Sequence, residues 1–115
     1  MSKDKFITKD SGERQEFPTG SRRDSQKGKP RYDLIPVDPL TRLAHLYARG
    51  AEKYDDNNWM KGQPMSRVYA SLFRHMIAWR QGDKTEDHLA AVCFNAMALM
   101  YYEDKKPELD DISEQ

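Results

Sequence analysis

The chain is poor in the features that fix a protein covalently or place it in a membrane. Its 115 residues include one cysteine, Cys93, so no disulfide can form within the chain. No apolar run approaches the length needed to cross a bilayer, and the first residues lack the continuous apolar segment of a secretion signal. We therefore expect a cytoplasmic protein. Cys93 lies in an apolar helical stretch and is predicted to be a buried structural thiol.

The chain also has no formal net charge, because its 19 lysines and arginines balance its 19 aspartates and glutamates. Bulk electrostatics therefore gives no case for a protein that coats nucleic acid or binds a membrane surface. Charged residues make up 33% of the chain and hydrophobic residues 37%, which is typical of one soluble domain with a modest core.

Three stretches with helical spacing of apolar residues form the body of the chain. The predicted helices cover residues 38–54, 66–82 and 85–104, with Asp38, Ser66 and either Thr85 or Asp83 as the expected N-caps. The predicted fold class is therefore all-α, a small helical bundle of three main helices with a basic N-terminal arm.

Polar segments flank this body. We predict a flexible N-terminal lead over residues 1–19, a folded domain over 20–104 and a disordered acidic tail over 105–115. Three helices in a short chain bury little surface. We therefore expect the bundle to be completed by self-association into a homo-oligomer, a dimer or a tetramer.

The third predicted helix carries polar side chains along one edge of an otherwise apolar rod. Asp87 and Asn95 lie on this edge at a multiple of four residues, and His88 lies beside them. Buried polar groups of this kind either face a ligand or metal, or satisfy one another in a structural hydrogen-bond network. We favour the ligand interpretation because other motifs in the chain support it.

Carboxylates gather near the predicted helix ends. Hard divalent cations such as Mg²⁺ or Mn²⁺ take oxygen ligands and keep waters or substrate phosphates in their remaining positions. Acids from separate helices can form such a site, and the candidates are Glu52, Asp55, Asp83, Glu86 and Asp87. The alternative is that Glu86 and Asp87 only favour the positive end of their helix and that Glu52 is solvated.

A cationic segment lies before the first helix. Residues 20–36 carry five basic side chains among glycines and prolines, which favours an extended arm; they are Arg22, Arg23, Lys27, Lys29 and Arg31. Such an arm suits a polyphosphate, because arginine can grip phosphate with two donors. The alternatives are a disordered basic arm or a nonspecific contact with nucleic acid.

Aromatic and amide side chains after the first helix can stack on and hydrogen-bond a nucleobase, although such aromatics more often close a core; they are Tyr54, Asn58 and Trp59. His75 is either a metal ligand or proton shuttle, or a core residue bonded to a carboxylate such as Asp87. Arg74 is then a phosphate contact or part of an interhelical ion pair.

An ordered series of motifs connects these candidates. It consists of Arg22-Arg23-Asp24-Ser25, residues 28–36, residues 50–54, Asn58-Trp59, Arg74-His75 with Trp79, and residues 87–91 with Phe94-Asn95. Together they resemble the phage dATP/dGTP diphosphohydrolases, MazZ-type relatives of the MazG-like all-α nucleotide pyrophosphohydrolases, over about residues 20–103. The resemblance implies metal-dependent cleavage of a purine deoxynucleoside triphosphate between its α and β phosphates. In phages whose DNA contains 2-aminoadenine, such an enzyme depletes dATP and supplies dGMP to a PurZ-type synthetase.

One departure prevents a direct transfer of metal ligands. The MazG relatives carry acid pairs at Glu-x-x-Glu and Glu-x-x-Asp spacing, whereas Glu52-x-x-Asp55 is the one comparable pair near a helix here. Helix geometry therefore assigns the roles. The leading metal ligands are Asp87 and Glu86, with Glu52 and Asp83 in support. The predicted catalytic residues are Asp87, Glu86 and His75. The predicted substrate contacts are Arg23, Lys29, Arg31, Lys53, Tyr54, Asn58, Trp59, Arg74 and Asn95.

Two other classes of function stay open at this point. One is a noncatalytic helical module that binds nucleotides or nucleic acid through the basic arm, which predicts salt-sensitive binding without product. The other is an interaction domain whose polar edge is a network at a subunit interface.

Overall fold

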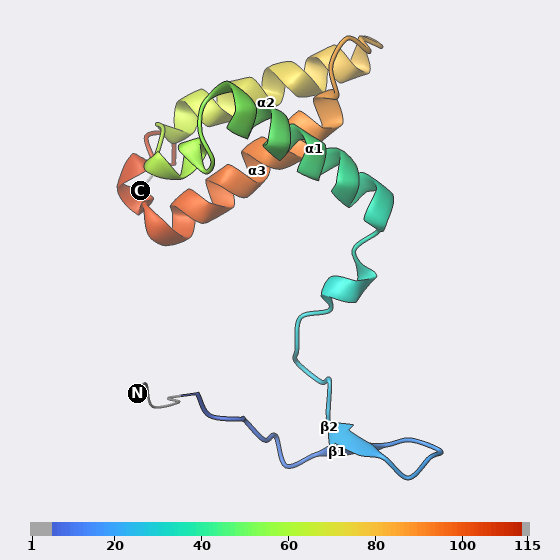
Figure 1. Cartoon of the computed structure of the whole chain (residues 1–115). Coiled ribbons are helices and arrows are strands. Elements are labelled where there is room, and N and C mark those ends of the chain that lie inside the picture. Colours follow the sequence, from blue (N-terminus) through green and yellow to red (C-terminus); the bar gives the residue numbers. More distant parts are fainter. Residues whose placement is uncertain (1–5, 114–115) are drawn as a thin grey trace. The chain divides into compact units, whose positions relative to one another are not determined.

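The computed structural model describes residues 6–113 and divides the chain into two units, one ending at Leu34 and one beginning at Ile35 (Figure 1). Each unit is described by itself. None of the described helices is both long enough and apolar enough to cross a membrane.

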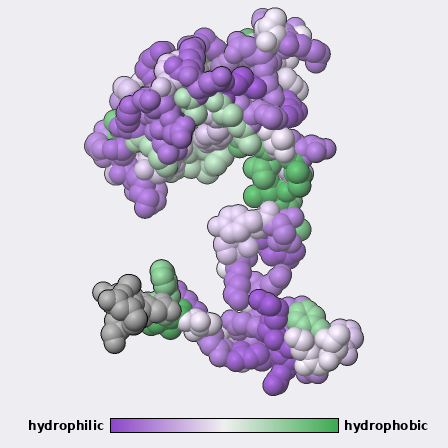
Figure 2. All heavy atoms as spheres, in the orientation of Figure 1, coloured by the Kyte–Doolittle hydropathy of each residue, from purple (hydrophilic) through white to green (hydrophobic). Residues whose placement is uncertain are grey.

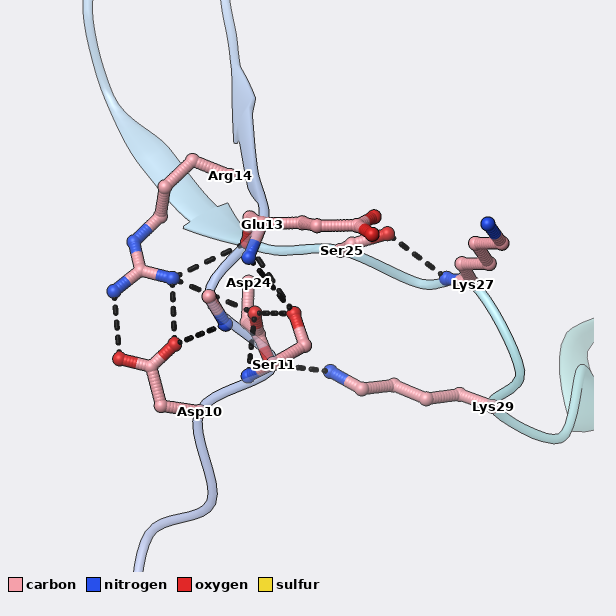
Figure 3. Close-up of polar contacts among 9 residues, drawn as sticks. Asp10, Ser11, Glu13, Arg14, Asp24, Ser25, Lys27 and Lys29 are labelled. Atoms are coloured by element: carbon pink, nitrogen blue, oxygen red, sulfur yellow. Dashed lines mark hydrogen bonds and ion pairs between the residues drawn. The ribbon is translucent and has the colours of Figure 1, made fainter.

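The first unit contains a short antiparallel hairpin. Strand β1 (Arg14–Glu16) pairs with β2 (Arg22–Asp24), with Gln15 opposite Arg23. Asp24 joins the parts of this unit, because its carboxylate accepts hydrogen bonds from Ser11 and lies 3.5 Å from both Arg14 and Lys29 (Figure 3). A 3₁₀ turn, η1 (Tyr32–Leu34), ends the unit.

The hairpin crosses the boundary predicted between a flexible lead and an extended arm. β1 lies inside residues 1–19, for which the sequence predicted no strand, so the prediction is wrong for Arg14–Glu16. The strands are three residues long and almost entirely charged, so they carry no alternation of apolar residues that would reveal them. Residues 1–5 of the predicted lead lie outside the described residues.

The second unit confirms the predicted all-α bundle of three main helices. They are α1 (Val37–Lys53), α2 (Met65–Arg80) and α3 (His88–Lys105), with 3₁₀ turns η2 (Asn58–Lys61) and η3 (Pro107–Leu109). α3 packs against both α1 and α2 (Figure 1). The predicted caps differ from those observed, because α1 and α2 follow Pro36 and Pro64, and α3 is capped by Asp87.

The core lies where α2 and α3 meet. Met65 and Val68 of α2 pack with Ala98 and Tyr102 of α3. Tyr102 is fully buried, and its hydroxyl donates a hydrogen bond to the backbone carbonyl of Trp59. This contact fixes η2 to the end of the bundle.

The C-terminal segment is part of this core rather than a disordered tail. Leu109 packs against the buried cluster, and Asp111 accepts hydrogen bonds from the backbone N–H and the hydroxyl of Ser66, at 2.8 and 2.5 Å. The prediction of disorder from residue 105 is therefore wrong up to Ser113, and the last two residues lie outside the described part. The acidic composition of this segment does not reveal the structural roles of Leu109 and Asp111.

Much apolar surface remains exposed on the second unit. Tyr69, Phe73 and Met76 of α2 are 47%, 52% and 38% exposed, and Met100 of α3 is 59% exposed. Figure 2 shows hydrophobic residues at the surface among mainly hydrophilic ones. Cys93 is also exposed, so the prediction of a buried thiol is wrong. Self-association stays a prediction.

Candidate functional site

A charged cleft of about 1010 Å³ opens between α1, the end of α2 and the start of α3. Arginines come from α1, and acids come from the connection between α2 and α3, including the N-cap of α3. The residues that line it are Arg42, His45, Leu46, Arg49, His75, Trp79, Asp83, Lys84, Thr85, Glu86, Asp87, His88, Leu89 and Ala91. The cleft therefore brings together four predicted site residues, namely His75, Asp83, Glu86 and Asp87.

Turn chemistry places the acids of the cleft. Gly82 adopts a φ of 82° just after α2, a conformation that glycine reaches without steric cost. Asp83 then accepts hydrogen bonds from the backbone N–H and hydroxyl of Thr85. Asp87 caps α3 by accepting from the N–H of Ala90 at 3.2 Å. The acids consequently lie at the positive end of the α3 dipole.

Asp87 and Arg42 form a two-pronged ion pair across the cleft. The Arg42 Nε lies 2.9 Å from Asp87 Oδ2, and the Nη2 lies 2.7 Å from Oδ1. The Arg42 guanidinium, the Ala90 N–H and the charge of Arg49 lower the pKa of Asp87 to about 2. Asp87 is therefore a carboxylate at every physiological pH. The expected bond between Asp87 and His75 is not formed.

A chain of three polar side chains runs beside this pair. Asp83 Oδ2 lies 2.5 Å from His88 Nε2, and His88 Nδ1 lies 2.9 Å from His75 Nδ1. Bonds from His88 and Thr85 lower the pKa of Asp83, so its oxygens accept and the Nε2–H of His88 donates. In neutral His88 the Nδ1 carries no hydrogen, so it accepts a hydrogen bond from the Nδ1–H of His75. In neutral His75 the Nε2 then carries no hydrogen and is an acceptor.

His88 is 5% exposed and is the buried anchor of this chain. The two imidazole rings lie 5.1 Å apart between centroids. The polar edge of α3 therefore combines both interpretations of the sequence, because His88 belongs to a satisfied hydrogen-bond network with Asp83 and His75 while Asp87 lines the cleft.

The carboxylate oxygens of the cleft are suitable ligands for a hard cation, but they are not arranged as a complete coordination site. Within residues 6–113, no three carboxylate, imidazole or thiol groups are arranged to hold a metal ion. Asp87 is engaged by Arg42, Asp83 is engaged by His88 and Thr85, and Glu86 is exposed. This set fits Mg²⁺ or Mn²⁺, which bind through one or two carboxylates and keep waters and substrate oxygens as the other ligands.

Glu52 does not line the charged cleft. It is exposed near the end of α1, three residues after Arg49, and therefore lies on the same side of that helix. Its role as a supporting metal ligand stays a prediction.

A second, smaller pocket of about 120 Å³ brings together the predicted base-binding side chains Tyr54, Asn58 and Trp59. Trp59 is held by edge-to-face contacts with Tyr47 and Tyr101, whose ring centroids lie 6.2 and 5.1 Å away. Trp59 thus closes the core while also lining the pocket. The Tyr54 ring is 60% exposed, and the predicted contact Lys53 places its ammonium 5.3 Å from that ring.

The predicted phosphate contacts of the basic arm belong to the first unit. Lys29 lies 3.5 Å from Asp24 (Figure 3), and Arg31 forms a two-pronged pair with Asp33 at 2.9 and 2.8 Å. Arg23 is exposed on β2. Exposed ion pairs of this kind are weak, so phosphate can compete for these cations.

The two remaining predicted contacts, Arg74 and Asn95, lie outside the cleft lining. Arg74 is exposed on α2. Asn95 is partly buried and its Nδ2 donates to the hydroxyl of Ser71 at 3.4 Å, a contact between α3 and α2. For Asn95 this bond favours the structural interpretation.

The basic side chains of the cleft were not predicted from the sequence, and no role was assigned to His88; they are Arg42, His45, Arg49 and Lys84. A signal was present, because Arg42, His45 and Arg49 lie at steps of three and four residues and thus share one face of α1.

Comparison with known proteins adds one finding. The model of a family described as dATP/dGTP diphosphohydrolase, N-terminal, matches residues 19–112. The match covers β2, all three helices and the cleft. No curated protein and no solved structure matches the chain.

Proposed function

This chain belongs to the dATP/dGTP diphosphohydrolase N-terminal family, and from that premise we propose that it hydrolyses dGTP or dATP to the monophosphate and pyrophosphate. The observation that carries the proposal is the charged cleft, in which Arg42, Arg49 and Lys84 face Glu86 and Asp87. Phosphoryl transfer needs cations that neutralise the phosphates and carboxylates that can hold a metal, and the cleft supplies both.

The cations bind the triphosphate in this proposal. Arginine offers a planar fork of donors that matches phosphate oxygens, and lysine adds a mobile point charge. Arg49 and Lys84 form no ion pair with any residue of the described part. Their charges are therefore free to attract an anionic ligand into the cleft. Lys29 and Arg31 of the basic arm add further phosphate contacts in this proposal.

A divalent cation, Mg²⁺ or Mn²⁺, is proposed as cofactor, held by Glu86 and Asp87 with support from Asp83 and Glu52. When bound, such an ion neutralises phosphate charge and acidifies a water molecule. Asp87 is suited to this part because its lowered pKa keeps it ionised. Glu86 is suited because its exposed carboxylate lines the cleft beside it.

His75 is proposed as the proton acceptor. Its Nδ1 is occupied by His88, so its Nε2 is the ring atom that can reach a water in the cleft. As the water oxygen bonds to phosphorus and the bond to the leaving pyrophosphate breaks, a proton passes to this Nε2. Asp83 stabilises the resulting positive charge through His88, because a carboxylate favours a protonated imidazole.

The biological setting proposed for this activity is a phage whose DNA contains 2-aminoadenine, where dATP is removed and dGMP is supplied. We also propose a homo-oligomer. The exposed apolar side chains of α2, Tyr69 and Phe73, support self-association because large apolar patches favour burial in an interface.

A product assay tests the proposed activity. The full chain is incubated with each deoxynucleoside triphosphate and Mg²⁺ or Mn²⁺, and monophosphate and pyrophosphate are measured. We expect turnover of dGTP or dATP, its loss in Asp87→Asn, and its retention in the control Asp104→Asn, an exposed acid at the other end of α3. Salt-sensitive nucleotide binding without product would instead establish the alternative, a noncatalytic binding module.

A further inference from the structure

Arg42 and Asp87 pair with each other, although the proposed function gives them different ligands, a phosphate for Arg42 and a cation for Asp87. Arg42 is a phosphate binder by its chemistry, and Asp87 is a cation ligand. In the structure each neutralises the other, with two bonds at 2.9 and 2.7 Å. The pair thus keeps the leading carboxylate of the cleft engaged by Arg42.

The pair is built to exchange partners. The Arg42 side chain is 56% exposed, so its guanidinium has room to turn toward a ligand in the cleft. Asp87 is only 21% exposed and is held in place by the Ala90 N–H, so its carboxylate stays where it is when Arg42 leaves. One partner is therefore mobile and the other is fixed.

The chemistry of a nucleoside triphosphate matches this exchange. Its phosphate oxygens accept the same two-pronged bond from Arg42 that Asp87 accepts. A divalent cation beside Asp87 is repelled while the Arg42 charge lies within hydrogen-bond distance of the same carboxylate. When the Arg42 guanidinium moves to a phosphate, the Asp87 carboxylate becomes a better ligand for the cation.

We propose that Arg42 is a positioning residue that exchanges Asp87 for a phosphate of the bound triphosphate, so that nucleotide binding opens Asp87 to the divalent cation. The inference rests on the proposed function, which supplies the triphosphate and the cation. It adds that the two ligands bind cooperatively, because each favours the open form of the same ion pair.

The first test measures Mn²⁺ binding to the full chain without nucleotide, by titration calorimetry. Arg42→Gln frees Asp87. We expect the Mn²⁺ affinity of this variant to exceed that of the parent by about tenfold or more, because a hydrogen bond between charged groups usually contributes that much binding free energy. Arg49→Gln is the matched control, because it removes the same charge from the same cleft without touching the bonds of Asp87. We expect it to raise the affinity less than about threefold.

The second test measures metal-free dGTP binding in the presence of a chelator. Asp87→Asn frees Arg42 and is expected to bind dGTP more tightly than Glu86→Gln, which removes an equal charge from the neighbouring residue. The extra gain of Asp87→Asn should vanish when Arg42→Gln is added, because the freed guanidinium is then missing.

Equal effects of Arg42→Gln and Arg49→Gln on Mn²⁺ affinity would overturn the inference, and so would the absence of Mn²⁺ binding in every variant. Circular dichroism establishes that each variant is folded; if Arg42→Gln is not, Arg42→Lys is compared with Arg49→Lys under the same criterion. If the chain turns over dGTP but Arg42→Gln does not raise the Mn²⁺ affinity more than Arg49→Gln does, the proposed function stands and this inference is wrong. The Arg42 effect without turnover supports the exchange and ends the proposed function.

Discussion

Asp87→Asn separates the contribution of Asp87 to stability from its contribution to activity. Asparagine is as good an N-cap as aspartate, so the variant keeps the cap of α3 and loses the charge that pairs with Arg42. We expect a small loss of stability and a complete loss of turnover. Replacement by alanine would remove the cap as well and confuse the two effects.

The size of the stability loss follows from the pKa of Asp87. The lowering from 3.8 to about 2 corresponds to about 2.4 kcal/mol at neutral pH. Arg42 is 56% exposed, so solvent screening reduces the expected loss to about 1.5 kcal/mol. Because the folded-state pKa is lowered, the stabilisation is present above pH 3.8 and declines as the pH falls toward 2. About half of it should be gone near pH 3.

The assay is urea unfolding followed by circular dichroism, for both proteins, at pH 7 and pH 3 in the presence of a chelator. dGTP hydrolysis is measured in parallel at pH 7. The reasoning is refuted if the variant is as stable as the parent at pH 7, or if the difference in free energy of unfolding does not shrink at pH 3. Turnover at the parent rate would remove Asp87 from the proposed metal site.

Two further predictions concern the ends of the chain. Asp111→Ala should lower the urea midpoint of unfolding, because two hydrogen-bonding groups of Ser66 lose their partner. Urea unfolding measures the change against the control Asp104→Ala, whose midpoint should equal that of the parent. Combined Lys29→Ala and Arg31→Ala should raise the KM for dGTP severalfold with little change in kcat, since a phosphate grip contributes to binding. Steady-state kinetics checks this outcome, and an unchanged KM would contradict a phosphate contact by the arm.

The helices could be predicted because their information is local. Each of α1, α2 and α3 shows apolar residues at helical spacing, and a glycine follows α2 closely enough to mark its end. The missed elements are held by polar contacts between distant residues. The hairpin depends on Asp24 meeting Ser11, and the C-terminal segment depends on Asp111 meeting Ser66. Composition does not reveal which acid finds which partner.

The acids of the candidate site could be predicted from the sequence, but their arginine partner could not. Asp83, Glu86 and Asp87 lie within five residues of one another, so their place just before α3 was recognisable. Arg42 is 45 residues away from Asp87, and their meeting depends on how α1 crosses α3. Helix packing of this kind is set by the shapes of many side chains, which periodicity does not specify.

The central claim is that the charged cleft between α1, α2 and α3 holds the triphosphate. A crystal structure of the full chain with Mg²⁺ and a non-hydrolysable dGTP analogue tests it most directly. We expect the phosphates between Arg42, Arg49 and Lys84, with the cation against Glu86 and Asp87. Phosphates bound elsewhere on the protein, with Arg42 still paired to Asp87 in an empty cleft, would contradict the account.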